Sequence, residues 1–266
     1  MSLILSEINI YPVKSCRGIS MEAWPLEPRG LQYDRRWMVV DDHDVFMTQR
    51  DFPRMALIDV HLEQDFLRLE APHMETLRVP LCTETTQHFS VTIWNDGVEA
   101  VSAGNEAAEW FSEFLSVGCK LVAMTERSVR PVAREYAVNA DEVSFADGFP
   151  LLLISEASLA DLNSRLPTPL PMKRFRPNLV VQGCAPFAED SWKELSIGGL
   201  RLHVVKPCAR CVITTVNPDT GVKDAEPLRT LATFRSRGNN VLFGQNVIPV
   251  GTGMLRVGEA VTVMRP

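Results

Sequence analysis

The sequence lacks features that would suit a membrane protein or a general nucleic-acid binder. Its longest apolar runs, such as 151–154 and 179–181, are far too short to span a bilayer. Residues 1–10 alternate in polarity and lack both a basic region and a cleavage site, so we expect a cytoplasmic protein without a membrane anchor. The net charge of −6 argues against nucleic acid as a partner, because non-specific affinity for it comes mainly from phosphate neutralisation.

Cysteine is sparse and scattered. Six cysteines in a chain of 266 residues that is 45% hydrophobic indicate reduced thiols rather than a disulfide framework. The close pair Cys208-Ala-Arg-Cys211 has no second Cys-x-x-Cys and no histidines at ligand spacing to complete a zinc site. Internal repeats and low-complexity segments are also absent. The composition therefore predicts a globular protein with a core of its own.

The apolar pattern predicts a β-rich mixed fold. Strands are expected at about 3–10, 37–40, 55–62 and 66–69, in a hairpin around Asn95-Asp96-Gly97, and at 151–154, 178–182, 196–206, 211–216, 246–250 and 260–264. Many short strands with irregular connections favour β-barrels over a layered parallel sheet.

Two helices are expected among these strands. One spans about 105–116, with Asn105 as its cap and an apolar face of Trp110, Phe111, Phe114 and Leu115. Ser155 is expected to cap the other, which the proline-rich stretch 167–171 ends. The weakly patterned segment 126–142 is interpreted as a connection between two halves.

Cys211 is the most informative residue of the chain. A thiolate is a soft metal ligand, and the neighbouring Arg210 favours its ionised form. The β-branched residues 212–216 predict a strand after it, which disfavours a thioredoxin-like motif, because that motif opens a helix. The motif alone leaves two interpretations open: buried structural thiols, or one thiolate that binds a metal.

Two basic segments could hold an anion. Lys14, Ser15 and Arg17 lie at a chain reversal and suit a phosphate, although a solvated turn is the alternative. Arg35 and Arg36 lead into an apolar strand, so at least one guanidinium needs a fixed partner. That partner is either Asp34 or a bound anion.

Two further segments could bind a heterocycle. Arg176 and Asn178 lie two residues apart, on the same face of an extended segment, where they could bind an anion and a heterocycle edge. Asp147 precedes the strand at 151 and could accept paired N–H donors. The alternative for all three residues is an exposed polar turn.

Taken together, these segments resemble the MOSC (molybdenum cofactor sulfurase C-terminal) superfamily. More narrowly they resemble the mitochondrial amidoxime-reducing components and their bacterial relatives. The resemblance covers about residues 3–264 and rests on segments 11–15, 34–37, 145–148, 175–178, 208–221 and 243–245, in family order. It implies a MOSC β-barrel domain at 124–266 and a smaller N-terminal β-rich domain at 1–123, with the strands of about 1–37 packing on the barrel.

The resemblance also implies a role for each candidate residue. Cys211 would bind molybdenum, beside the two dithiolene sulfurs of a molybdopterin cofactor. The residues implied for the cofactor phosphate are Lys14, Ser15 and Arg35, and those implied for the pterin and its phosphate end are Asp147, Arg176 and Asn178. Cys208 is expected to be a buried neighbour, and Cys184 a thiol near the site that is not a ligand.

The implied activity is the two-electron reduction of N-hydroxylated compounds: amidoximes, N-hydroxylamines and N-hydroxylated bases. The sequence lacks a Cys-x4-Cys-x2-Cys run, so we expect no iron–sulfur cluster in it. A separate ferredoxin, flavodoxin or reductase-linked carrier would then supply electrons to an enzyme that we expect to be monomeric. The alternatives are a cofactor carrier or persulfide-bearing protein without turnover, and a β-barrel binding protein with structural thiols.

Overall fold

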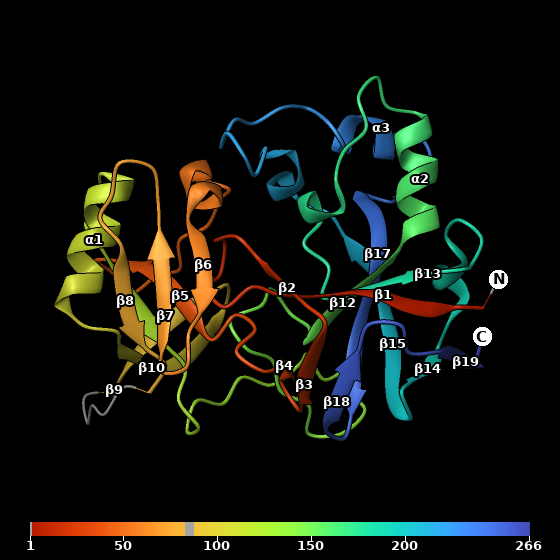
Figure 1. Ribbon diagram of the computed structural model, residues 1–266, viewed down its shortest axis with the longest axis horizontal. Coiled ribbons are helices and arrows are strands. Elements are labelled where there is room, and N and C mark those ends of the chain that lie inside the picture. Colours follow the sequence, from red (N-terminus) through yellow and green to blue (C-terminus); the bar gives the residue numbers. More distant parts are fainter. Residues whose placement is uncertain (1, 83–87) are drawn as a thin grey trace.

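The computed structural model describes residues 2–82 and 88–266, so residue 1 and residues 83–87 of the predicted first domain lie outside the described residues. Its largest element is a nine-stranded sheet (Figure 1). In spatial order the strands are β19 (Val261–Arg265), β14 (Glu194–Ile197), β15 (Leu200–Ala209), β17 (Asn240–Val250), β12 (Leu151–Ser155), β13 (Leu179–Gln182), β1 (Ile4–Ile10) and β2 (Ile19–Met21), with β16 (Ser236–Arg237) paired to β17.

This sheet curls back on itself. Ile4 of β1 forms a β-bridge with Ala260, which directly precedes β19 at the other end of the strand order. The amide of Leu5 donates to the carbonyl of Glu259 at 2.9 Å, and the amide of Val261 donates to the carbonyl of Leu3 at 2.9 Å. Closure removes the exposed strand edges at this point. The predicted β-rich mixed fold is confirmed.

The remaining strands form three small sheets. One has the order β5 (Trp37–Asp41), β11 (Cys119–Ala123), β10 (Asp96–Ser102) and β9 (His88–Ile93). The second joins β6 (Asp59–Leu62), β7 (Phe66–Glu70) and β8 (Leu77–Pro80), and the third joins β18 (Gly253–Arg256), β3 (Ala23–Glu27) and β4 (Gly30–Leu31). In Figure 1 the first two sheets lie on the left and the curled sheet on the right. The limit between residues 123 and 124 stays a prediction.

Helices are short and cover the sheets. They are α1 (Asn105–Leu115), α2 (Glu156–Ser164) and α3 (Leu228–Ala232), together with the 3-10 turns η1 (Pro53–Leu57), η2 (Met172–Arg174), η3 (Ala188–Ser191) and η4 (Val212–Thr215). The predicted apolar face of α1 is buried, and Ser155 caps α2 by accepting from the amide of Ser158. No helix among the described residues is long and apolar enough to cross a membrane.

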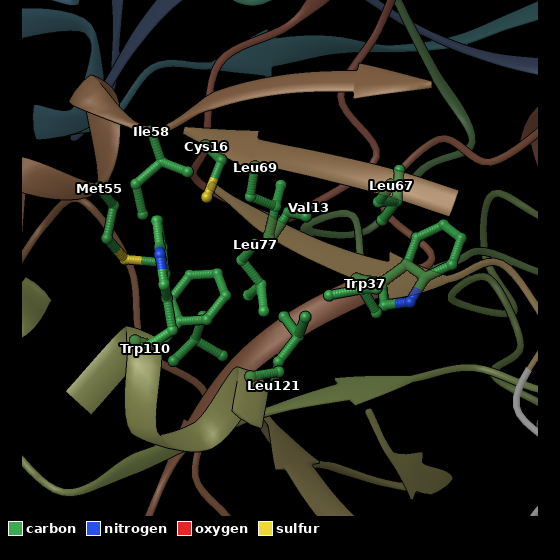
Figure 2. Close-up of a cluster of buried hydrophobic side chains, with 14 of the residues drawn as sticks. Val13, Cys16, Trp37, Met55, Ile58, Leu67, Leu69, Leu77, Trp110 and Leu121 are labelled. Carbon is green, nitrogen blue, oxygen red and sulfur yellow. The ribbon is translucent and has the colours of Figure 1, made fainter. Parts of the chain in front are cut away.

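Two of the buried clusters meet near the N-terminal chain reversal. The first packs α1 against β5–β8 and β11, and it includes Val13 and Cys16 (Figure 2). The second fills the curled sheet, with Leu5, Ile8 and Ile10 of β1 among its members. The chain between β1 and β2 thus passes from one core to the other, which fixes the position of Lys14 and Ser15.

Several predicted boundaries are wrong for local reasons. The predicted strand 55–62 begins as the turn η1, with Pro53 at its start, and becomes strand only at Asp59. The predicted strand 196–206 is a hairpin, because Gly198 and Gly199 both adopt positive φ and form its two-residue loop. The hairpin predicted at 95–97 turns at Trp94 and Asn95. Gly104, and not Asn105, is the N-cap of α1.

Truncating Phe111 is expected to destabilise the protein strongly. Its side chain is fully buried between α1 and the neighbouring sheets. Phe111→Ala leaves a cavity there and should lower the free energy of unfolding by about 3–5 kcal/mol. Phe66→Ala, which removes a ring that is 39% exposed, is expected to cost about 1 kcal/mol or less. Urea unfolding of both variants checks this, and equal losses of stability would contradict the assignment of the core.

Candidate functional site

The structure brings together all seven residues that the sequence predicts for the site. They line one pocket, here named the Cys211 pocket: Lys14, Ser15, Arg35, Asp147, Arg176, Asn178 and Cys211. The chain reversal after β1, the loop before β12, the loop before β13 and the end of β15 each contribute to its wall. Residues far apart in the sequence therefore share one concave surface, although their roles there stay predictions.

Cys211 lies at the N-terminus of the turn η4. Its backbone is extended (φ −111°, ψ 177°), and its carbonyl accepts from the amide and the hydroxyl of Thr214 at 3.2 and 3.0 Å. The hydroxyl of Thr215 donates to the carbonyl of Val212 at 2.8 Å. The strand predicted at 211–216 is therefore wrong, because these threonine bonds close a tight turn.

The other two candidate thiols differ from expectation. Cys208 is half-buried rather than buried, lines the same pocket, and accepts from Nη1 of Arg210 at 3.1 Å. The guanidinium expected beside Cys211 thus contacts Cys208. Cys184 lies outside the pocket lining and packs against the core of the curled sheet, where burial raises its pKa. All six cysteines are free.

Asp147 is the acidic centre of the pocket. Its two carboxylate oxygens accept from different cations, Nζ of Lys14 at 2.6 Å and Nη2 of Arg50 at 2.7 Å. Burial alone would raise its pKa, but the two cations outweigh burial and hold the pKa of Asp147 well below its usual range. About half of its side-chain surface stays exposed, at 51%, so the carboxylate can still reach a ligand.

Lys14 is a buried amine that can donate one further hydrogen bond. Burial lowers its pKa to about 8, and the neighbouring Asp147 limits the fall. Nζ donates to Asp147 and to the carbonyl of Phe145, at 2.8 Å, which leaves one of its three protons for a ligand. Lys14 is thus positioned to hold an anion while its amine is protonated.

Anion binding at Lys14 is expected to weaken as the pH rises through 8. Deprotonation removes a charge-assisted hydrogen bond, so the affinity of the metal-free protein for inorganic phosphate should fall by about tenfold between pH 7.5 and 9.5. Phosphate is a dianion throughout most of this range, so its own titration does not cause the fall. Calorimetry on the wild type and on Lys14→Met checks this. The variant should bind weakly at both pH values, and a wild-type affinity independent of pH would contradict the assignment.

Arg35 pairs with Asp34, one of the two partners that the sequence leaves open, and it also lines the pocket. Its Nη1 donates to the fully buried Asp34 at 2.5 Å and to Oδ1 of Asn178 at 3.0 Å. Asp34 in turn accepts from the amide of Tyr11 at 2.8 Å. The guanidinium groups of Arg35 and Arg176 both lie over the ring of Tyr11, at 4.4 and 4.2 Å. A fixed pair of cations therefore faces the pocket.

The segment 176–178 is not the extended stretch predicted. Arg176 adopts the left-handed conformation, with φ 56°, and β13 begins only at Leu179. Its Nη1 donates to the carbonyl of Cys16 at 2.7 Å, and burial lowers its pKa to about 10. Asn178 is 1% exposed; its Oδ1 accepts from Arg35 and from the amide of Leu152, and its Nδ2 donates to the carbonyl of Asn9. Asn178 thus holds the pocket wall in place.

Arg17 lies outside the pocket lining, although its segment suggests an anion site. Its Nη1 donates to Asp59 at 2.8 Å and its Nη2 to the carbonyl of Pro218 at 2.9 Å. Pro218 belongs to the loop that follows η4. Arg17 therefore links the chain reversal to the segment that carries Cys211.

Two arginines at the site, Arg130 and Arg50, are not among the residues that the sequence predicts for it. Arg130 is almost fully buried and donates to the carbonyls of Ser144, Ala146 and Asp147, which fixes the loop that presents Asp147. It lies in the segment interpreted as a connection, where the weak available signal is its place between Val129 and Pro131. Arg50 has no such signal, because its partners are distant in sequence.

The chain is similar to known proteins over nearly its whole length. A family model described as the MOSC N-terminal beta barrel domain matches residues 2–118, and one described as the MOSC domain matches residues 140–262. Mitochondrial amidoxime-reducing component 1 of Mus musculus is 37% identical over 279 residues, which cover 98% of this chain and 82% of that protein. Mitochondrial amidoxime reducing component 2 of Rattus norvegicus is 38% identical over 279 residues, covering 97% and 82%. The chain therefore belongs to the MOSC superfamily, in the family of the mitochondrial amidoxime-reducing components.

Proposed function

We propose that this protein is a molybdenum-cofactor-dependent reductase of N-hydroxylated compounds, among them amidoximes, N-hydroxylamines and N-hydroxylated bases. Its relationship to proteins named amidoxime-reducing components indicates a MOSC oxidoreductase. The observation that supports the finer proposal is the Cys211 pocket, in which a thiol, a carboxylate and a set of cations from five separate segments converge.

The donor set of the pocket fits the cofactor. Among the described residues its lining holds the cations Lys14, Arg35, Arg176 and Arg210 and one carboxylate, Asp147. This local excess of positive charge in a protein of net charge −6 suits an anionic phosphate. The thiol of Cys211 suits a soft metal that already carries sulfur ligands. Cys211 would hold the metal, Lys14, Ser15 and Arg35 the phosphate, and Arg176 and Asp147 the pterin end, while Asn178 would orient Arg35.

When bound, the cofactor supplies the chemistry that converts N–OH and two electrons and two protons into N–H and water. The chain's own residues bind and orient. Asp147 bridges Lys14 and Arg50 and favours the charged form of the Lys14 amine, and Arg130 holds the Asp147 loop. Electrons would come from a separate ferredoxin, flavodoxin or reductase-linked carrier. We also propose that the protein is cytoplasmic.

An assay with molybdenum analysis tests the function. The protein is produced in a host that makes the cofactor, and reduction of benzamidoxime and N-hydroxyadenine is followed with an artificial reductant. We expect turnover that depends on the molybdenum content of the preparation. A molybdenum-loaded protein that reduces neither compound would contradict the reductase proposal.

A second candidate is a sulfur-handling or cofactor-carrying protein without turnover. One observation favours it: Cys208 is a further half-buried thiol in the same pocket, 3.1 Å from a guanidinium that would stabilise a charged sulfur. A persulfide on Cys208 or Cys211 in the mass spectrum, combined with inertness toward N-hydroxylated compounds, would support this candidate.

A further inference from the structure

The guanidinium of Arg50 lies beside the sulfur of Cys211. Its Nη2 lies 3.5 Å from Sγ of Cys211 and 2.7 Å from Oδ2 of Asp147, so a single nitrogen contacts both groups. Arg50 follows β5 of the four-stranded sheet, whereas Cys211 follows β15 of the curled sheet. The contact therefore joins two parts of the chain that have separate cores.

Arg50 is held in this position from several sides. Its guanidinium lies over the indole of Trp94, 4.7 Å from the ring centroid, and its side chain is only 17% exposed. Its amide donates to the hydroxyl of Thr48 at 3.1 Å, and its carbonyl accepts from Nζ of Lys223. A surface arginine with one weak ion pair would lack these constraints. The guanidinium is therefore fixed relative to the sulfur.

A fixed cation beside a metal-bound thiolate has a predictable electrostatic effect. Arginine keeps its charge at every relevant pH, so the charge at this position is constant. Positive charge near a metal favours the state with one more electron, because the added negative charge is attracted. We infer that Arg50 is a positioning residue that orients the Cys211 sulfur and raises the reduction potential of the metal bound there. This inference rests on the proposed function.

A purely structural explanation makes a different prediction. If Arg50 served only as an ion-pair partner of Asp147, replacing it would change stability and cofactor retention but not the potential of the metal that is retained. The potential therefore separates the two explanations. Arg54 is the matched control, since it lies four residues along the same segment and packs over Phe114 at 4.6 Å, away from the pocket lining.

The experiment compares Arg50→Gln, Arg50→Lys and Arg54→Gln with the wild type. Each is purified with cofactor, its molybdenum content is measured, and the midpoint potential of the metal is determined by redox titration with electron paramagnetic resonance. For Arg50→Gln we expect the equilibrium constant for one-electron reduction to fall by about tenfold, which is about 59 mV toward lower potential. Arg50→Lys should shift less in the same direction, and Arg54→Gln should not shift.

The outcomes are distinguishable. An Arg50→Gln protein that retains molybdenum at the wild-type potential overturns the inference and leaves the proposed function standing. A wild type without molybdenum overturns the proposed function instead. If Arg50→Gln does not fold, or folds but loses the metal, Trp94→Leu decides. Its half-exposed ring supports Arg50, so its loss should lower the potential, and an unchanged potential overturns the inference.

Discussion

Cys211→Ala is expected to reduce reductase activity by at least about 100-fold. Loss of a residue that only supports a metal ligand costs up to about 100-fold, and loss of the ligand itself should cost at least as much. Cys211 follows β15 and lines the pocket, with its sulfur beside Arg50. Molybdenum content should fall less than activity, because Lys14, Arg35 and Arg176 remain to hold an anionic cofactor. Steady-state assays normalised to molybdenum content separate the two effects.

Cys208→Ala is the matched control for this experiment. It removes a thiol of the same pocket, three residues away, whose partner is Arg210 rather than Arg50. We expect it to keep the metal and most of the activity. Equal losses in the two variants would show that the pair acts together, and full activity in Cys211→Ala would contradict its assignment as the ligand.

Asp147→Asn is expected to have the second largest effect, on cofactor retention and on stability. The substitution leaves Lys14 and Arg50 beside each other without their shared anion. Breaking a buried ion pair costs about 3–5 kcal/mol, and the partial exposure of Asp147 reduces this to about 1–3 kcal/mol. Burial without the carboxylate lowers the pKa of Lys14 further, so its amine loses charge near neutral pH and the phosphate loses a partner.

The double variant Lys14→Met with Asp147→Asn tests the cause. Removing the unpaired amine should recover part of the stability that Asp147→Asn loses, because the two residues are directly coupled. Molybdenum content should stay low, since both groups that face the cofactor are gone. Thermal unfolding and metal analysis of the two single variants and the double variant check this. Strictly additive losses of stability would contradict the coupling.

Much of the fold could be predicted from local pattern. The expected strand of β1, the apolar run of β5 and the apolar face of α1 all appear. The face of α1 packs on one core, whereas β5 is buried on both faces, with Trp37 and Val39 in one cluster and Met38 and Val40 in another. The alternation of β1 is interrupted by a register shift between Leu5 and Glu7. The turn at η4 could not be predicted in this way. Its β-branched residues favour a strand, but the hydroxyls of Thr214 and Thr215 bond to nearby carbonyls and stabilise the turn.

The pocket lining was predictable in part, but the contacts within the site were not. All seven predicted residues line the pocket, because family-like motifs mark them individually. The contacts depend on how distant segments meet. Arg210 adjoins Cys211 in sequence yet contacts Cys208, while Arg50, far away in sequence, contacts Cys211. Adjacency along a chain that reverses direction does not determine which side chains meet in space.

X-ray absorption at the molybdenum edge, on protein purified from a cofactor-producing host, tests most directly the claim that Cys211 binds the metal of a molybdenum cofactor. We predict molybdenum in the wild type with one sulfur ligand more than in a Cys211→Ser variant, and no such difference for Cys208→Ser. A wild type without molybdenum, or the same number of sulfur ligands in the wild type and the Cys211→Ser variant, would contradict the account.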